Sequence, residues 1–164
     1  NGTYYFVTWD CTSMVSEEKL KSNAISDAFF KEKIPLIKAQ KKLLIFDTCN
    51  AGGAIERIAF RSASTEERAK VLLARNTGIH ILAATTKVQR AAEFQELGHG
   101  VFTYAILEGL KGKAAQGGII TVRSLSLYLD AKVQELTKKY MNSEQYPTYA
   151  SGGGGQDFPI ITAP

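Results

Sequence analysis

The sequence predicts a mixed α/β domain with a mostly parallel central sheet. Two short apolar runs, KKLLIFD at residues 41–47 and IHILAA at residues 79–84, have the continuous hydrophobicity of strands buried on both faces. Segments with the spacing of amphipathic helices lie before, between and after these runs. Because strands that alternate with helices are typical of a sheet packed between helices, we expect one compact domain over residues 1–164.

The N-terminal quarter predicts one strand and one helix. Residues 3–9 are rich in Tyr, Phe, Val, Thr and Trp, which favour a strand. The preceding Asn-Gly pair is a turn signal that normally joins two strands, so we expect the natural domain to continue upstream of Asn1. In LKSNAISDAFFKEK, residues 20–33, apolar residues recur at the spacing of one helix face, and Pro35 ends the segment.

The remaining chain predicts three more helices and a last short strand. Residues 64–75 begin with a capping-box pattern, and residues 101–112 read as a helix stopped by Gly112. Residues 121–141 predict an amphipathic helix. Its expected inward side chains are Leu125, Leu129, Leu136 and Tyr140. The glycine-rich stretch SGGGGQD is expected to be a loop that leads to a strand at residues 158–161.

Composition excludes several classes of function. The formal net charge of +4 is too small for the clustered basic stripe that nucleic-acid binding needs, and no apolar run approaches the roughly 20 residues of a membrane span. Cys11 and Cys49 are too few for a disulfide framework, which favours a reducing, cytoplasmic location. His80 and His99 lack zinc-site spacing, so we expect no metal and no cofactor.

The stretch LLIFDTCNAGG, residues 43–53, holds the candidate catalytic residue. In open α/β sheets, sites form at the carboxyl ends of the strands, and Cys49 follows such a strand. A thiolate is nucleophilic, and the small residues after it let a substrate backbone approach while main-chain N–H groups hold an oxyanion. The alternative is that Cys49 is a small buried hydrophobe that ends a strand.

Four stretches together resemble the caspase-like peptidases, the clan of caspases, metacaspases and their bacterial relatives. LLIFDTCNAGGA resembles the nucleophile segment, and YYFVTWD resembles the strand that follows the catalytic His-Gly in bacterial members. Residues 81–112 resemble the small-subunit strand, substrate loop and helix, and residues 145–160 the closing segment. The resemblance implies a three-layer α/β/α sandwich, with residues 1–53 from the large subunit, 54–77 as linker and 78–164 from the small subunit.

The resemblance also implies roles for individual residues. Cys49 would be the nucleophile, and its own N–H would contribute to the oxyanion hole. Asp47 matches the acid that lines the first specificity pocket in metacaspases, which implies cleavage after Arg or Lys by charge pairing. An alternative for Asp47 is a cap for the following turn or helix. Asp10 and Glu93 match acidic positions near the pocket rim, although both could be ordinary surface charges.

Further positions follow from the same resemblance. Thr85 and Thr86 lie where the substrate-pairing edge begins. The clan uses a His-Cys dyad, and no histidine precedes Cys49 in this chain, so we expect the catalytic histidine on an upstream large-subunit segment that acts as a partner. His99 leads into a helix and is interpreted as a loop or helix-cap residue, and His80 as a core histidine.

The predicted function is therefore that of a cysteine endopeptidase acting on a protein or peptide substrate. The segment between the two subunit parts contains four candidate self-cleavage sites, Arg57, Arg61, Arg68 and Arg75. Two alternatives stay open: a catalytically inactive caspase-like binding or scaffold module, and an unrelated α/β small-molecule enzyme or receiver-like binding domain in which Cys49 is incidental. Calcium dependence is left unassigned, since no recognisable calcium loop is present.

Overall fold

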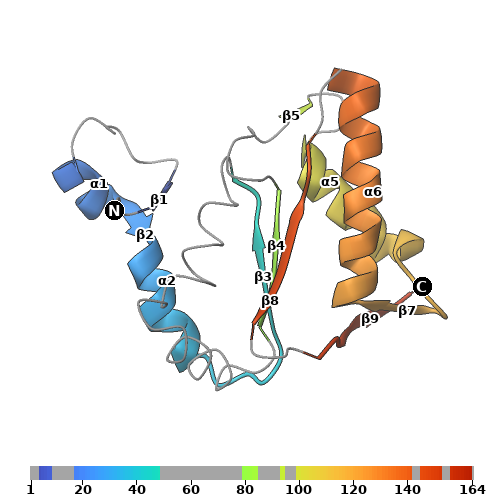
Figure 1. Ribbon diagram of the computed structural model, residues 1–164, viewed down its shortest axis with the longest axis horizontal. Helices are drawn as coiled ribbons and strands as arrows, with labels where there is room; N and C mark the ends of the chain where they lie inside the picture. The colour runs from blue at the N-terminus through green and yellow to red at the C-terminus, as the bar shows by residue number, and fades with distance from the viewer. Residues whose placement is uncertain are drawn as a thin grey trace.

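The computed structural model describes residues 4–8, 17–48, 79–84, 93–94, 99–141, 145–152 and 156–163 of the chain. Helices and strands are mixed along it (Figure 1). In chain order the elements are β1 (Tyr5–Val7), α1 (Glu17–Asn23), β2 (Ala24–Ser26), α2 (Asp27–Lys33), the 3-10 turn η1 (Ile34–Leu36), β3 (Lys42–Phe46), β4 (Ile79–Ala83), β5 (Glu93–Phe94), β6 (His99–Gly100), α5 (Val101–Glu108), the irregular turn η4 (Gly109–Lys113), β7 (Ile119–Thr121), α6 (Val122–Met141), β8 (Thr148–Gly152) and β9 (Pro159–Thr162).

The central sheet has the order β3-β4-β8 among the described residues. β3 and β4 are parallel, with Leu44 opposite Ile81, whereas β4 and β8 are antiparallel, with Ile81 opposite Ala150. The α/β class is confirmed. One of these two pairings is antiparallel, so a mostly parallel sheet stays a prediction.

β4 is buried along its whole length, as predicted from IHILAA, since all five of its residues are buried. Its side chains alternate between two apolar clusters, because successive residues of a strand point to opposite faces. Leu82 belongs to the cluster formed with α5 and α6, whereas Ile81 belongs to the cluster that includes Ile34 of η1 and is packed by Phe30 of α2. Helical segments therefore cover both faces of β4 (Figure 1).

β3 is less buried than the sequence predicts. Phe46 is buried, but Ile45 on the opposite face is 45% exposed, and the first three residues are only half-buried. The described sheet pairs β3 with β4 alone, so β3 is an edge strand there. The expectation that KKLLIFD is buried on both faces is therefore wrong in this structure.

The single helix predicted over residues 20–33 is also wrong, because a short strand divides it. α1 ends at Asn23, and β2 then pairs antiparallel with β1, which places Ile25 opposite Phe6. α2 begins immediately afterwards, and the Ser26 hydroxyl accepts a hydrogen bond from the Phe29 N–H at 3.3 Å. Ser26 is thus a helix N-cap, a role for which serine is well suited.

α5 and α6 agree closely with the predictions. Gly112 has φ of 119°, a conformation that favours glycine, and it interrupts the helical geometry after α5 as expected. Leu125, Leu129 and Leu136 of α6 are buried. Tyr140 is 38% exposed instead of inward, and the Lys139 ammonium lies over its ring, 4.8 Å from the centroid.

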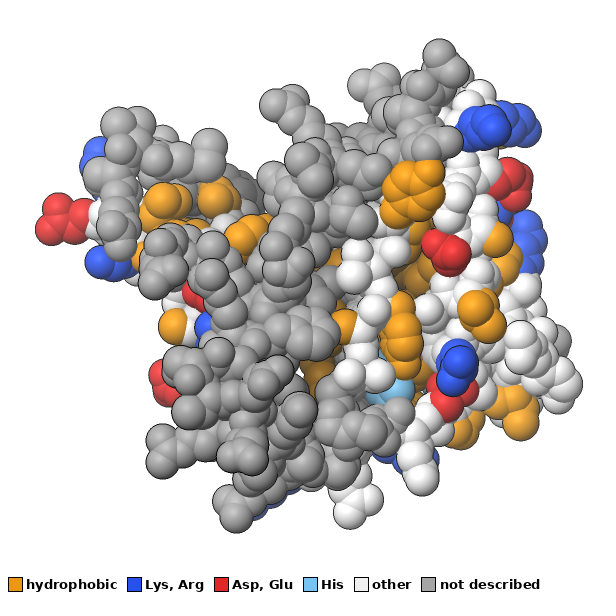
Figure 2. Space-filling model, viewed as in Figure 1, with side chains coloured by type: hydrophobic (Ala, Val, Ile, Leu, Met, Phe, Trp, Pro, Cys, Tyr) orange, Lys and Arg blue, Asp and Glu red, His pale blue; other side chains and the backbone are white. Residues whose placement is uncertain are grey.

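The N-terminus of α6 is capped by reciprocal hydrogen bonds. The Ser124 N–H donates to Thr121 Oγ1 at 3.1 Å, and the Thr121 N–H donates to Ser124 Oγ at 3.0 Å. The outer face of α6 carries charged side chains of both signs (Figure 2). Within the described part of the chain, no helix combines the length and apolarity needed to cross a membrane.

The C-terminal region contains one predicted strand and one that was missed. β9 covers most of the expected strand FPII and pairs with β7. β8 was not predicted, and it uses the first residues of the glycine-rich stretch, Ser151 and Gly152, which pair with His80 and Ile79. The predicted helix at residues 64–75 lies outside the described residues.

Candidate active site at the carboxyl ends of β3 and β4

β3 and β4 end side by side because they are parallel and in register. Phe46 lies opposite Ala83, and the Ala84 N–H donates to the Phe46 carbonyl oxygen at 2.9 Å just beyond the two strands. β8 begins at the same edge, with Thr148 opposite Ala83. β5 lies at this upper end of the molecule in Figure 1, and β7 and β9 lie at the lower end. This is the edge where ligand sites of open α/β sheets form.

Of the predicted site residues, Asp47 is the one whose side chain lies in the described part of the structure. It follows β3 directly, and its side chain is exposed. The Thr103 hydroxyl, in the first turn of α5, donates a hydrogen bond to Asp47 Oδ2 at 2.5 Å. This contact joins the strand end to a helix 56 positions later in the chain. The described contact of the carboxylate is therefore tertiary, in contrast to the alternative of a local cap.

Thr48 lies next to Asp47 and has the opposite environment. Its side-chain oxygen is buried and has no hydrogen-bond partner among the described residues. The two residues after β3 thus alternate, with the carboxylate of Asp47 toward solvent and the hydroxyl of Thr48 toward the interior. Thr48 therefore anchors the backbone just after β3, while the Asp47 carboxylate stays accessible to solvent.

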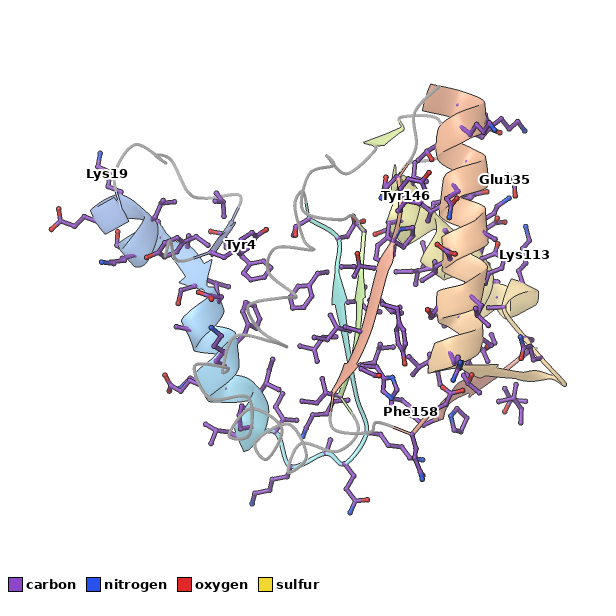
Figure 3. All side chains as sticks on the ribbon, in the orientation of Figure 1. Tyr4, Lys19, Lys113, Glu135, Tyr146 and Phe158 are labelled. Carbon is purple, nitrogen blue, oxygen red and sulfur yellow. The ribbon has the colours of Figure 1, made fainter. Side chains whose placement is uncertain are left out.

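Gln145 binds the backbone just after β4, and the sequence did not predict this role. Its side-chain amide donates to the Ala84 carbonyl oxygen at 2.6 Å, and only 2% of the residue is exposed. Its backbone N–H donates to Thr137 Oγ1 of α6 at 3.3 Å. Figure 3 shows the neighbouring Tyr146 at the upper end of the sheet, where β4 ends. Gln145 lies in the mostly polar stretch MNSEQYP, residues 141–147, where nothing in the sequence distinguishes it, so its burial in the structure is what identifies it.

The other predicted site residues are mostly outside the described part of the chain. These are Cys49, Asp10, Thr85 and Thr86. The backbone of Glu93 belongs to β5 and pairs with Gly100, but its side chain is not among those described. His99 lies in β6 and Gly100 is the N-cap of α5, so the loop or helix-cap interpretation of His99 is corrected to a short strand.

His80 is a core histidine, as predicted, and its hydrogen bonds indicate its tautomer. The residue is fully buried in β4. Nε2 lies 3.2 Å from the Gln156 carbonyl oxygen, which can only accept, so Nε2 carries the proton. In the neutral imidazole with that tautomer, Nδ1 accepts from the Tyr149 hydroxyl, which lies 2.8 Å away. The Phe158 ring packs edge-on against the imidazole, and Figure 3 places Phe158 at the lower end of the sheet, away from Tyr146.

Two further observations concern possible ligand sites. A pocket of about 230 Å³ lies between α6 and β8, and its lining includes Leu82, Asp130, Pro147 and Tyr149. Across the described residues, no group of three or more His, Cys, Asp or Glu side chains is arranged to hold a metal ion. Among the described residues at the strand ends, the polar group available to a ligand is the Asp47 carboxylate, which the Thr103 hydroxyl holds by a hydrogen bond.

The family of the chain follows from its sequence as a whole. A family model for the caspase domain matches residues 8–158, which includes β3, β4 and the edge where they end. The fold and this match define the class: an α/β domain of cysteine-type peptidases. The chain belongs to the caspase domain family. Neither the curated proteins nor the solved structures gave a match.

Proposed function

We propose that this chain is the main part of an endopeptidase that cleaves after Arg or Lys, with Cys49 as nucleophile. The catalytic histidine comes from an upstream large-subunit segment, and the complete domain is a three-layer α/β/α sandwich. Residues 1–53 belong to the large-subunit part, 54–77 to the linker and 78–164 to the small-subunit part. The family membership and the mixed α/β fold support this proposal.

The observation that carries the specificity is the exposed carboxylate of Asp47, two residues before Cys49. A guanidinium presents paired N–H donors that match the two oxygens of a carboxylate, so such a pair is both strong and directional. An ammonium can also pair with the carboxylate, although without the fork geometry. An acid at this position therefore favours a basic residue on the substrate.

The proposed reaction follows the chemistry of an activated thiol. The Cys49 thiolate attacks the scissile carbonyl carbon, and the carbonyl oxygen becomes an oxyanion that the Cys49 N–H helps to hold. The carbon–nitrogen bond then breaks, and the amine leaves with a proton donated by the upstream histidine. Water attacks the resulting thioester and gives one proton to the histidine, and the tetrahedral intermediate then collapses to the carboxylic acid and the Cys49 thiolate.

The remaining proposed site residues belong to the substrate-binding surface. Thr85 and Thr86 follow Ala84, whose backbone is held by Phe46 and Gln145, and we place them at the edge that pairs with the substrate chain. Glu93 and Asp10 add negative charge near the rim of the pocket. These roles rest on the resemblance of the matched segments.

The test compares fluorogenic peptides that differ only at the cleavage position, carrying Arg, Lys, Gln or Asp. The complete protein is expected to cleave the Arg and Lys peptides. Cys49→Ala is expected to abolish turnover, and Asp47→Asn to lower kcat/KM for Arg about 30-fold while sparing Gln, the size expected of a charged hydrogen-bonded pair. Glu18→Gln, which removes the same charge from an exposed position of α1, is the matched control.

The outcomes separate the alternatives. Equal turnover by the complete protein and Cys49→Ala contradicts the assignment of the nucleophile. Preference for Gln or Asp peptides contradicts the specificity. Absence of turnover with every peptide, together with unchanged partner binding by Cys49→Ala, indicates a scaffold module instead of an enzyme.

A further inference from the structure

We propose that Thr103 is a positioning residue for substrate selection, and that its hydroxyl sets the orientation of the Asp47 carboxylate that receives the basic side chain. This inference rests on the proposed function, since it assigns a role to the residue that supports the same acid. Thr103 itself touches the acid and not the reacting atoms.

The geometry places a fixed donor against an exposed acceptor. Thr103 is half-buried in α5, and its Oγ1 lies 2.5 Å from Asp47 Oδ2. A carboxylate offers about four lone-pair positions, and the hydroxyl takes one of them. The Oδ1 atom and the second lone pair of Oδ2 provide acceptor positions for a guanidinium. The hydroxyl thus selects one rotation of the carboxylate without removing its capacity to pair.

Thr103 is held more firmly than Asp47. Its neighbours Val101, Phe102 and Ala105 are fully buried in the cluster that α5 and α6 form on β4. Asp47, in contrast, lies beyond the last residue of β3, and its side chain is exposed. An exposed side chain loses rotamer freedom when it clamps a ligand, and a partner that orders it beforehand lowers that cost.

This arrangement predicts an effect on binding more than on chemistry. The contact between Asp47 and a basic side chain is remote from the scissile bond and is present in both the bound substrate and the transition state. Loss of such uniform binding raises KM and leaves kcat unchanged. Thr103→Val, which replaces the hydroxyl by a methyl group of similar size, is therefore expected to raise KM for Arg peptides about 3- to 10-fold.

The experiment is a double-mutant cycle in the complete protein, using the Arg and Gln peptides described above. The variants are Thr103→Val, Asp47→Asn and the double variant, with Thr103→Ser to restore the hydroxyl. Thr162→Val makes the same chemical change at an exposed position of β9, which belongs to the separate β7-β9 sheet. Far-UV circular dichroism and urea unfolding of each variant measure the folded fraction independently of the pocket.

Thr103→Val is expected to raise KM for the Arg peptide but not for the Gln peptide. Thr103→Ser is expected to restore most of the affinity for the Arg peptide. When Asp47→Asn is also present, adding Thr103→Val is expected to change KM less than about 2-fold. An equal effect of Thr103→Val in both backgrounds, or no effect in either, overturns the inference while Asp47 keeps its role. If Asp47→Asn leaves the preference for Arg intact, the proposed specificity itself fails. A Thr103→Val protein that does not fold is replaced by Thr103→Ala, and the same cycle decides.

Discussion

The side-chain amide of Gln145 donates a 2.6 Å hydrogen bond to the carbonyl oxygen of Ala84, and both residues are buried. Ala84 is the first residue after β4, and its N–H is already bonded to Phe46 at the end of β3. With the Gln145 amide in place, both the N–H and the carbonyl of Ala84 have hydrogen-bond partners at the edge where the candidate site lies. A buried carbonyl needs a hydrogen-bond donor, since leaving it unpaired costs free energy.

Gln145→Leu should destabilise the protein by about 1–3 kcal/mol, because the Ala84 carbonyl would stay buried without its donor. Urea unfolding followed by circular dichroism measures the difference. Gln116→Leu, at an exposed position before β7, should change stability by less than about 0.5 kcal/mol. Equal stability of the two variants would show that the hydrogen bond contributes nothing to the fold.

Tyr128 should make the folded state sensitive to alkaline pH. Burial, with smaller contributions from the Glu108 and Glu135 carboxylates, raises the pKa of the Tyr128 hydroxyl to about 12, against an ordinary value of 10.0. As pH rises above 10, the unfolded chain loses this proton while the folded protein retains it, so the free energy of unfolding falls between pH 10 and 12. Below pH 10 this contribution is fully present.

Tyr128→Phe should remove that part of the pH dependence, since phenylalanine has no proton to lose. Urea midpoints of the two proteins, measured at intervals from pH 8 to pH 12, provide the comparison. The difference between their unfolding free energies should be constant near pH 8 and should shift in favour of the variant above pH 10. Parallel curves across the whole range would rule out a raised pKa at Tyr128.

Self-cleavage is the third prediction, and it depends on the proposed specificity. If Asp47 selects basic residues, incubation of the complete protein should produce new termini after one or more of four arginines. These are Arg57, Arg61, Arg68 and Arg75. Mass spectrometry identifies the termini, and Cys49→Ala is the control that should stay intact. New termini that follow other residues, or none in residues 54–77, would refute self-processing by this activity.

Local pattern was sufficient where one element supplies its own signal. The continuous apolar run of IHILAA predicted β4, and helical spacing predicted α6 with its buried Leu125 and Leu129. The likeness of the matched segments to caspase-like peptidases agrees with the family match over residues 8–158. Each of these signals lies in consecutive residues, so no distant partner was needed to read them.

Local pattern failed where a partner strand decides the conformation. Ala24–Ser26 lies within a helical pattern, yet pairing with β1 makes it β2. β8 has no strong strand signal in its glycine-rich end, but β4 provides a full row of partners for it. In both cases backbone hydrogen bonds to another segment outweigh intrinsic preference, which is a weak guide in a packed protein.

The sequence by itself determined the class of this protein, the order of Asp47 and Cys49 after an apolar strand, and the helices and strand with strong periodicity. Only the tertiary structure decided what holds the site edge. The partners there are distant in the chain, 56 positions for Thr103 with Asp47 and 61 positions for Gln145 with Ala84. A hydroxyl or an amide can pair with many groups, and which one it meets depends on how the helices pack on the sheet.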